Sequence, residues 1–296
     1  MGQLLRRLLW YAAVVGSTVN PQRTEDNRLP EITDQDFISQ CVSSHNQYRS
    51  AVAPAARDMF YMTWDDALAI TARAWARHCK FMHNPRLQPP REVHPTFNSV
   101  GENIWVGAPY STFTVEGAMK LWCDEVADYD YSSNGCTNVC GHYTQVVWAK
   151  SYKVGCAVQA CPNGVEFTSF ADRPGAIFVC NYGDAGNYAG VHPFMDGQSC
   201  SECGGGTCEN NLCRDAKRDQ LKRYDWTPSW DPGASTPGTN TPGTSIPGTS
   251  TPGASSSASC GSYCLGVLIT RPLSVLLIFI GVYGLQMLYP NLFFYE

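Results

Sequence analysis

Cysteine is the residue type that most constrains this chain, which carries 14 of them in 296 residues. Disulfides persist in oxidising compartments, and a cytosolic protein seldom carries so many thiols. Cys200, Cys203, Cys208 and Cys213 crowd a short stretch that contains three consecutive glycines. So short a stretch has no core of its own, so two disulfides are its expected source of order. A zinc knuckle is the alternative, because Cys200 and Cys203 have Cys-x-x-Cys spacing, but a secreted chain favours disulfides.

Both ends of the chain have the pattern of membrane-directed segments. Arg6 and Arg7 precede an apolar run and then small residues, which predicts a signal peptide at residues 1–17 rather than a ragged tail. Residues 272–289 are apolar and just long enough to cross a bilayer, so they predict a transmembrane helix. The same residues fit a lipid-anchor signal, with the small residues 255–262 as attachment sites. The absence of a basic stop sequence slightly favours the lipid anchor.

Residues 228–259 contain a five-residue repeat of the Pro-Gly-Thr type. The repeat has no apolar face to bury, so it predicts an extended stalk, of a composition that is often O-glycosylated. The stalk argues against a core helix at 272–289, because no domain remains there for it to pack against. The globular part is therefore expected within about residues 28–230. The formal charge of −5, without a basic cluster, argues against nucleic-acid binding.

Hydrophobic periodicity divides the globular part into helices followed by strands. Apolar residues recur at helical spacing over residues 33–48, 65–82 and from 114 onward. The period changes to two over residues 143–148, 154–159 and 177–182, which predicts three strands. Helices that precede strands favour an α+β fold with helices packed on an antiparallel sheet.

Four short motifs then give the chain a specific resemblance: Gly141–Trp148, Phe178–Tyr188, His45–Arg49 and Gly101–Trp105. In the order in which they occur along the chain, these motifs resemble the CAP superfamily of cysteine-rich secretory, antigen 5 and pathogenesis-related 1 proteins, and within it the group of glioma pathogenesis-related protein 1-like proteins. The resemblance implies a CAP domain at residues 28–195, built as a three-layer α-β-α sandwich. It also implies that a cysteine-rich hinge follows at residues 196–215.

The resemblance further implies a cleft that holds two histidines and two glutamates, here His83, His142, Glu102 and Glu125. Glu125 falls on the apolar stripe of the third expected helix, where a carboxylate needs a partner, although it could also be a rim residue. Taken singly, either histidine could be structural. Two histidines leave a tetrahedral zinc ion short of protein ligands, so any zinc is expected to be weak and labile. We expect the two rings to approach closely enough to share one ion.

The family also implies three disulfides, between Cys79 and Cys161, between Cys156 and Cys180, and between Cys136 and Cys140. Two more are expected within the hinge. Cys41 and Cys123 remain, and these two could bridge or stay as free buried thiols. Of the other histidines, His45 is expected to hydrogen-bond inside the core, and the remaining ones have no acidic or histidine neighbours at ligand spacing: His78, His94 and His192.

These features predict an extracellular module that is attached to the outer face of the plasma membrane by a single pass or a lipid anchor. By resemblance its partners are lipids, sterols or an extracellular protein, in defence, growth or fertilisation. A metal-dependent hydrolase is the alternative, with a glutamate as general base. No His-Glu-x-x-His or Gly-x-Ser-x-Gly motif supports an enzyme, so binding is favoured. Channel modulation is weaker still, because the cysteine-rich domain that it needs is missing.

Overall fold

The computed structural model describes residues 28–233. The predicted signal peptide, the apolar C-terminal segment and most of the predicted stalk lie outside the described residues. Within residues 28–233, no helix combines the length and the apolar character needed to cross a membrane.

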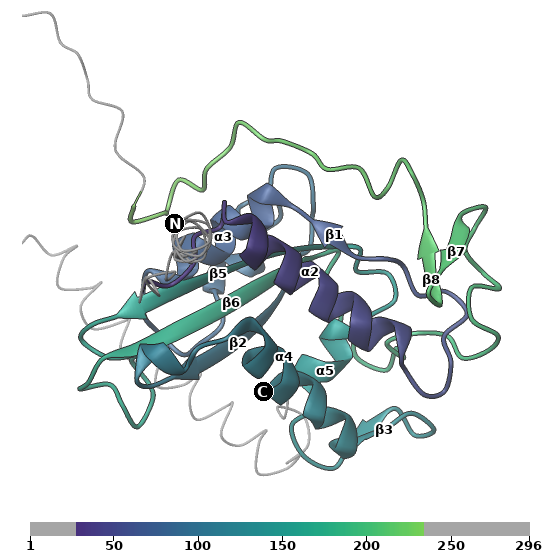
Figure 1. Cartoon of the computed structure of the whole chain (residues 1–296), viewed down its shortest axis with the longest axis horizontal. Helices are drawn as coiled ribbons and strands as arrows, with labels where there is room; N and C mark the ends of the chain where they lie inside the picture. The colour runs from purple at the N-terminus through teal and green to yellow at the C-terminus, as the bar shows by residue number, and fades with distance from the viewer. Residues whose placement is uncertain (1–27, 234–296) are drawn as a thin grey trace, which may run out of the picture. The chain divides into compact units, whose positions relative to one another are not determined.

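A four-stranded sheet forms the centre of the module, in the order β1-β5-β6-β2 (Figure 1). Its central strands β5 (Lys153–Cys161) and β6 (Gly175–Gly183) pair antiparallel over nine residues each. The edge strand β2 (Gly101–Gly107) runs antiparallel to β6, and the short β1 (Thr63–Trp64) runs parallel to β5. Every residue of β6 is buried, because helices cover both faces of the sheet.

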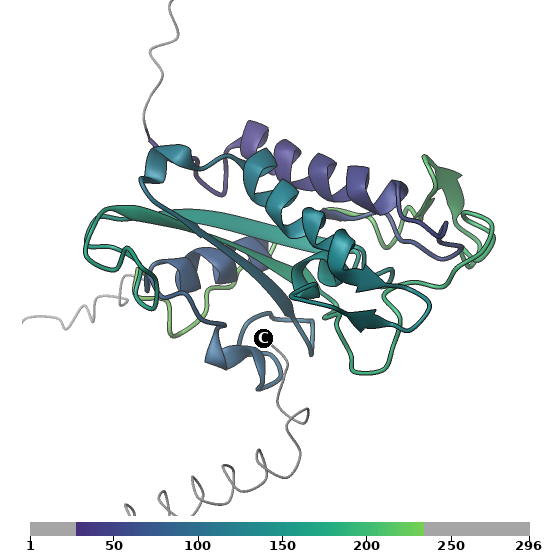
Figure 2. The ribbon, with the colours of Figure 1, turned by 90° about the horizontal axis from the view of Figure 1, so that it is seen from below.

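The helices make two further layers, so the predicted three-layer α+β sandwich is confirmed. Figure 2 shows α2 (Gln35–Ser50) and α4 (Val115–Asp124) on one face and α3 (Asp66–Ala76) on the other. The core on the α2 and α4 side contains Phe37, Trp122 and Phe178, and the core under α3 contains Trp75 and Ile177. Helix α3 reaches the sheet closely because β5 has Gly155 there, where a side chain would strike the backbone of α3.

Polar side chains begin each of these helices. Asp34 accepts a hydrogen bond from the backbone N–H of Asp36, and Asp65 accepts from the first N–H groups of α3. Thr114 caps α4 through its hydroxyl oxygen. Such caps satisfy N–H groups that have no partner inside the helix.

The smaller elements complete the described chain. Two hairpins accompany the main sheet, one of β3 (Tyr129–Asp130) with β4 (Gly135–Cys136) and one of β7 (Thr207–Glu209) with β8 (Leu212–Arg214). The short helices are η1 (Pro85–Leu87), η2 (Tyr110–Thr112), η3 (Glu125–Asp128) and α5 (Gly141–Val146).

The structure corrects three sequence-based assignments. Residues 143–148 were expected as a strand, but Gly141–Val146 is the helix α5, so its buried residues follow one side of a short helix. The second helix ends at Ala76 rather than near Met82, because Cys79 takes a left-handed conformation and is tied to Cys161. Strand β2 lies between two helices, so the helices do not all precede the strands.

Residues 215–233, here called the strap, run back from the hinge hairpin along the module (Figure 1). The Tyr224 hydroxyl donates to Asp65 Oδ2 at 3.0 Å, and the Trp230 indole N–H donates to the carbonyl of Glu92 at 3.1 Å. Near the end of the strap, Asp231 forms an ion pair with Arg77 at 2.7 Å. The first described residues of the predicted stalk therefore pack against the module.

Candidate functional site

The four residues of the expected cleft come from four separate elements. His83 lies in the loop after α3, and Glu102 lies at the start of the edge strand β2. Glu125 opens η3 directly after α4, and His142 lies in the first turn of α5. The structure pairs His83 with Glu102 and His142 with Glu125.

In the first pair a buried carboxylate holds an exposed imidazole. His83 Nδ1 lies 2.9 Å from Glu102 Oε1, and the backbone N–H of Asn84 donates to the same oxygen at 2.9 Å. The Glu102 side chain is only 1% exposed, whereas that of His83 is 63% exposed. The hydrogen bond to Glu102 raises the pKa of His83 above its ordinary value, although partial burial of the ring opposes it.

The second pair is built around the start of α5. His142 Nδ1 lies 2.6 Å from Glu125 Oε1, while Oε2 accepts from the backbone N–H groups of His142 and Tyr143. The capping residue Cys140 offers no side-chain hydrogen bond to this helix, so Glu125 supplies the missing acceptor from a different segment. Trp122 stacks on the His142 ring, with the ring centroids 6.0 Å apart.

One strand residue connects the pairs. Asn103 follows Glu102 in β2, and its side-chain N–H donates to the carbonyl of His142 at 3.0 Å. The same amide donates to the Tyr182 hydroxyl at 3.2 Å. The strand that carries the first glutamate therefore also fixes the backbone of the second histidine.

The Tyr182 hydroxyl extends this network to a histidine in the core. Because Tyr182 accepts from Asn103, its own O–H donates to His45 Nε2 at 2.9 Å, and His45 Nδ1–H donates to the Cys41 carbonyl at 2.7 Å. This assignment requires a neutral His45 ring. Burial lowers the pKa of His45 to about 4. The expectation that His45 hydrogen-bonds inside the core is confirmed.

The depressed pKa of His45 predicts a loss of stability in acid. The unfolded chain takes up this proton as the pH falls below about 6.5, whereas the folded chain takes it up only near pH 4. The free energy of unfolding should therefore decrease between these values, by at most about 3 kcal/mol from this residue. A His45→Gln variant keeps a donor and an acceptor but does not titrate. Urea unfolding at pH 7.5 and 4.5 should show a smaller acid loss for the variant, and equal losses would contradict the assignment.

The geometry of both pairs suits a metal ligand. Each imidazole directs Nδ1 to a carboxylate, so Nε2 is the nitrogen left for a metal, and carboxylates commonly orient metal-binding histidines in this way. Within residues 28–233, three donors lie within 4.8 Å of one another in one group only, Cys200, Cys203 and Cys213. These sulfurs belong to two disulfides and are not thiolates, so the zinc-knuckle alternative receives no support.

The cysteines fall into five disulfides and two thiols among the described residues. The bonds join the pairs that the resemblance implied, and the hinge contains the bonds Cys200–Cys208 and Cys203–Cys213. Cys41 and Cys123 are both free and buried. Burial raises the pKa of both thiols, so neither is an activated nucleophile.

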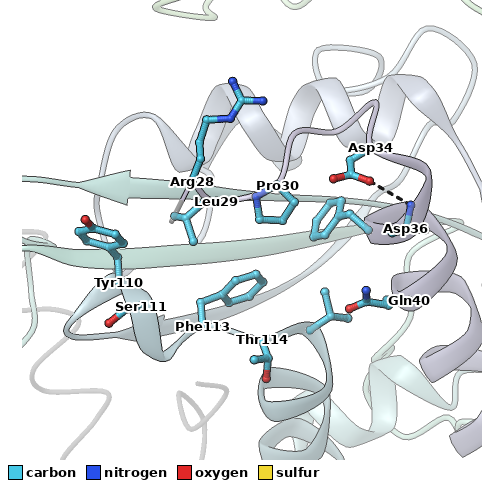
Figure 3. Close-up of a pocket in the computed structure, with 12 residues that line it drawn as sticks. Arg28, Leu29, Pro30, Asp34, Asp36, Gln40, Tyr110, Ser111, Phe113 and Thr114 are labelled. Atoms are coloured by element: carbon cyan, nitrogen blue, oxygen red, sulfur yellow. Dashed lines mark hydrogen bonds between the residues drawn. The ribbon is translucent and has the colours of Figure 1, made fainter. Parts of the chain in front are cut away.

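A separate cavity of about 380 Å³ lies where the N-terminal segment, α2 and α4 begin (Figure 3). Pro30 and Phe113 line it with apolar surface, and Arg28, Asp34 and Gln40 add polar groups at its edge. Its volume lies within the range of small-molecule sites. None of the four cleft residues lines it. Sequence reasoning did not find it, because its walls come from segments about 80 residues apart.

Sequence reasoning also missed the environment of His94. His94 was expected to have no acidic neighbour, but its Nε2 lies 3.1 Å from Asp65 Oδ1, and both side chains are fully buried. Asp65 at the same time caps α3 and accepts from Tyr224 of the strap. Because Asp65 is 29 residues away in the sequence, local spacing carried no signal of the pair. In contrast, the histidine ion pairs within residues 28–233 do not include His78 or His192.

Comparisons with known proteins identify a family and several relatives of this chain. A family model described as the cysteine-rich secretory protein family (CAP) matches residues 42–182. GLIPR1-like protein 1 of Bos taurus is 45% identical over 78% of this chain and 92% of its own length. Glioma pathogenesis-related protein 1 of Mus musculus is 47% identical over 76% of this chain and 81% of its own. The solved structure of Na-ASP-1 is 28% identical, with a TM-score of 0.48, over 63% of this chain and 51% of that one.

Proposed function

The chain belongs to the cysteine-rich secretory protein (CAP) family of extracellular proteins, and from this we propose that it is a membrane-tethered binding module with a zinc site. His83 and His142 bind the ion through Nε2, and Glu102 and Glu125 orient the two rings. The module binds a lipid, a sterol or an extracellular protein at the outer face of the plasma membrane.

The observation that carries the zinc site is the matched pair of carboxylate–histidine contacts, at 2.9 and 2.6 Å. A carboxylate on Nδ1 fixes the tautomer, so that Nε2 presents its lone pair to an ion. Two protein nitrogens leave coordination positions for water or for a group of the bound partner, so the affinity is weak. Isothermal titration of zinc into the purified module tests this site.

The hydrolase alternative gains no support from the same contacts. A general base must have a carboxylate oxygen free to take a proton from water. Glu102 is buried and accepts from His83 and Asn84, and Glu125 accepts from His142 and from two backbone N–H groups. Both carboxylates thus already serve to position the histidines, which favours binding over catalysis.

The cavity at the start of α2 and α4 supports the lipid or sterol part of the proposal. Its apolar surface around Phe37 and Phe113 suits a hydrocarbon group, and Arg28 at its edge suits a polar or anionic head. Lipid extraction and mass spectrometry of the purified module test this part. Recovery of no lipid or sterol above a matched protein blank would favour a protein partner instead.

The tether predicts where the module resides in cells. Removal of residues 260–296 should release nearly all of it into the medium, because the five disulfides and the core lie within residues 28–233. Immunoblots of medium and membranes measure this release. A phospholipase specific for glycolipid anchors, applied to the full chain, separates the two anchor types, since release would eliminate the transmembrane helix. Release of the untruncated chain without any enzyme would contradict the tether.

A further inference from the structure

Three large apolar side chains are exposed on two loops that meet beside the end of α3. Phe81 and Met82, in the loop after this helix, are 42% and 43% exposed, and Phe167, between β5 and β6, is 68% exposed. We call these three residues the sheet-end patch, because they lie at the end of the sheet where β5 ends and β6 begins.

Hydrogen bonds hold the two loops of the sheet-end patch together. The backbone N–H of Phe81 donates to the carbonyl of Glu166 at 3.0 Å, and that of Glu166 donates to the carbonyl of Cys79 at 2.8 Å. The disulfide Cys79–Cys161 closes the same unit, and the indole N–H of Trp75 donates to the Met82 carbonyl at 2.9 Å. A fixed backbone therefore presents these side chains to solvent.

The backbone of Phe167 adds a second unusual feature. Its φ of 67° lies in the left-handed region, which is unfavourable for a bulky residue. The conformation leaves the ring as one of the most exposed apolar groups among residues 28–233. Residues held in such conformations tend to occur where a side chain serves a contact.

The strap brings the end of the described chain to this edge. Asp231 binds the guanidinium of Arg77 through both carboxylate oxygens, at 2.7 and 2.9 Å, and Gly233 is in contact with the same guanidinium. Arg77 caps the C-terminus of α3 and precedes Phe81 by four residues. Figures 1 and 2 both show the strap ending at the edge of the sheet that carries the β5–β6 loop. The chain therefore continues toward residues 272–289 from a point beside the sheet-end patch.

We propose that the sheet-end patch is a membrane-contact surface, which inserts Phe81, Met82 and Phe167 into the interface of a phospholipid bilayer. The proposal rests on the tether proposed above, because the tether keeps the module within reach of the lipid. The 38 residues between Gly233 and Pro272 span at most about 130 Å when fully extended. A tethered surface is present at a high effective concentration, so three apolar side chains suffice for a contact that is weak in free solution.

The charges beside the patch favour a neutral lipid surface over a strongly anionic one. Lys80 is paired with Glu166 at 3.2 Å, and Arg77 is paired with Asp231, so the charges of these two cations are compensated. Contact then depends on burial of apolar area rather than on attraction to phosphate. Phosphatidylcholine is accordingly the suitable probe.

The experiment attaches the module to the bilayer artificially, so that its result does not depend on the native anchor. The chain through Gly233, with a C-terminal histidine tag, is bound to phosphatidylcholine vesicles that contain a nickel-chelating lipid. This piece contains the five disulfides and the buried core, so we expect it to fold by itself. An environment-sensitive dye is placed at Met82→Cys or, as the control, at the exposed Val191→Cys.

We expect dye emission at position 82 to shift to the blue on tethering, and emission at position 191 to stay unchanged. Phe81→Gln with Phe167→Asn should reduce the shift about fivefold, because apolar burial is lost while Asn tolerates the left-handed backbone. Leu121→Gln, which removes an exposed apolar group outside the patch, should leave the shift unchanged.

No shift at position 82, or equal shifts at both positions, would overturn the proposal while leaving the native tether standing. Sedimentation provides a further test, since a dimer that becomes a monomer in the Phe81→Gln, Phe167→Asn variant would identify the patch as a contact between copies. The comparison of the two dye positions remains decisive even if the patch variant fails to fold.

Discussion

The double variant His83→Ala, His142→Ala should lose measurable zinc binding and keep its fold. Both proposed ligand nitrogens are removed, whereas the five disulfides and the helix caps remain. Glu102→Gln or Glu125→Gln should weaken zinc binding about 10- to 100-fold, since each carboxylate orients a ring and does not itself bind the ion in this proposal. Titration calorimetry measures the affinity, and circular dichroism checks the fold.

The zinc affinity of the unaltered module should also fall as the pH is lowered. Zinc competes with a proton for the imidazole, and Glu102 raises the pKa of His83, so this ring is protonated at a higher pH than usual. His192→Ala is the matched control, because this exposed histidine contacts only a backbone carbonyl and a tyrosine ring outside the two pairs. Unchanged zinc affinity in the double variant, or an equal loss in the control, would refute the site.

The four family motifs predicted more of the site than hydrophobic periodicity did. Glu102 and Glu125 were expected beside His83 and His142 by resemblance, and the structure pairs each glutamate with one histidine. Helical and strand spacing alone placed His142 at the head of a strand. The segment is too short for its buried residues to distinguish the two periods, and the acceptor that caps α5 comes from Glu125, 17 residues earlier.

Contacts between distant segments could not be predicted either, because they leave no local pattern in the sequence. The strap binds through Tyr224 and Asp231 to residues 159 and 154 positions earlier, and neither residue belongs to a local pattern. Composition identified residues 228–259 as a stalk but could not indicate that Trp230 and Asp231 fit sites on the module. The caps of α2 and α4, in contrast, depend on residues within one turn, so the signal for them is local in the sequence.

Arg49 is the most consequential residue whose role the sequence did not reveal, although it lies in one of the four motifs. Its side chain is fully buried, and the five N–H groups of its guanidinium make six hydrogen bonds to backbone carbonyls at 2.6 to 3.1 Å, so one N–H of Nη2 is shared between two carbonyls. The acceptors are the carbonyls of Phe60, Val146, Trp148, Ala149 and Ser151. Arg49 thus joins α2 to the segment that connects α5 with β5.

Burial lowers the pKa of Arg49 to about 9, so the guanidinium remains charged at neutral pH and its donors remain engaged. Arg49→Ala should therefore lower the free energy of unfolding by about 4 kcal/mol or more, because several buried carbonyls lose their donor and a large cavity forms. The free energy of unfolding of Arg49→Lys should lie between those of the unaltered module and Arg49→Ala, since an ammonium group has three donors and cannot reach five carbonyls at once.

Urea unfolding with the disulfides intact measures these differences. Arg57→Ala is the control, because its ion pair with Glu202 is exposed and should contribute less than about 1 kcal/mol. Since Arg49 anchors the carbonyl at the end of α5, its loss should also loosen His142 at the start of that helix and weaken zinc binding. A loss of stability in Arg49→Ala no larger than that in Arg57→Ala would show that the carbonyls find other donors, and that α5 is held without this residue.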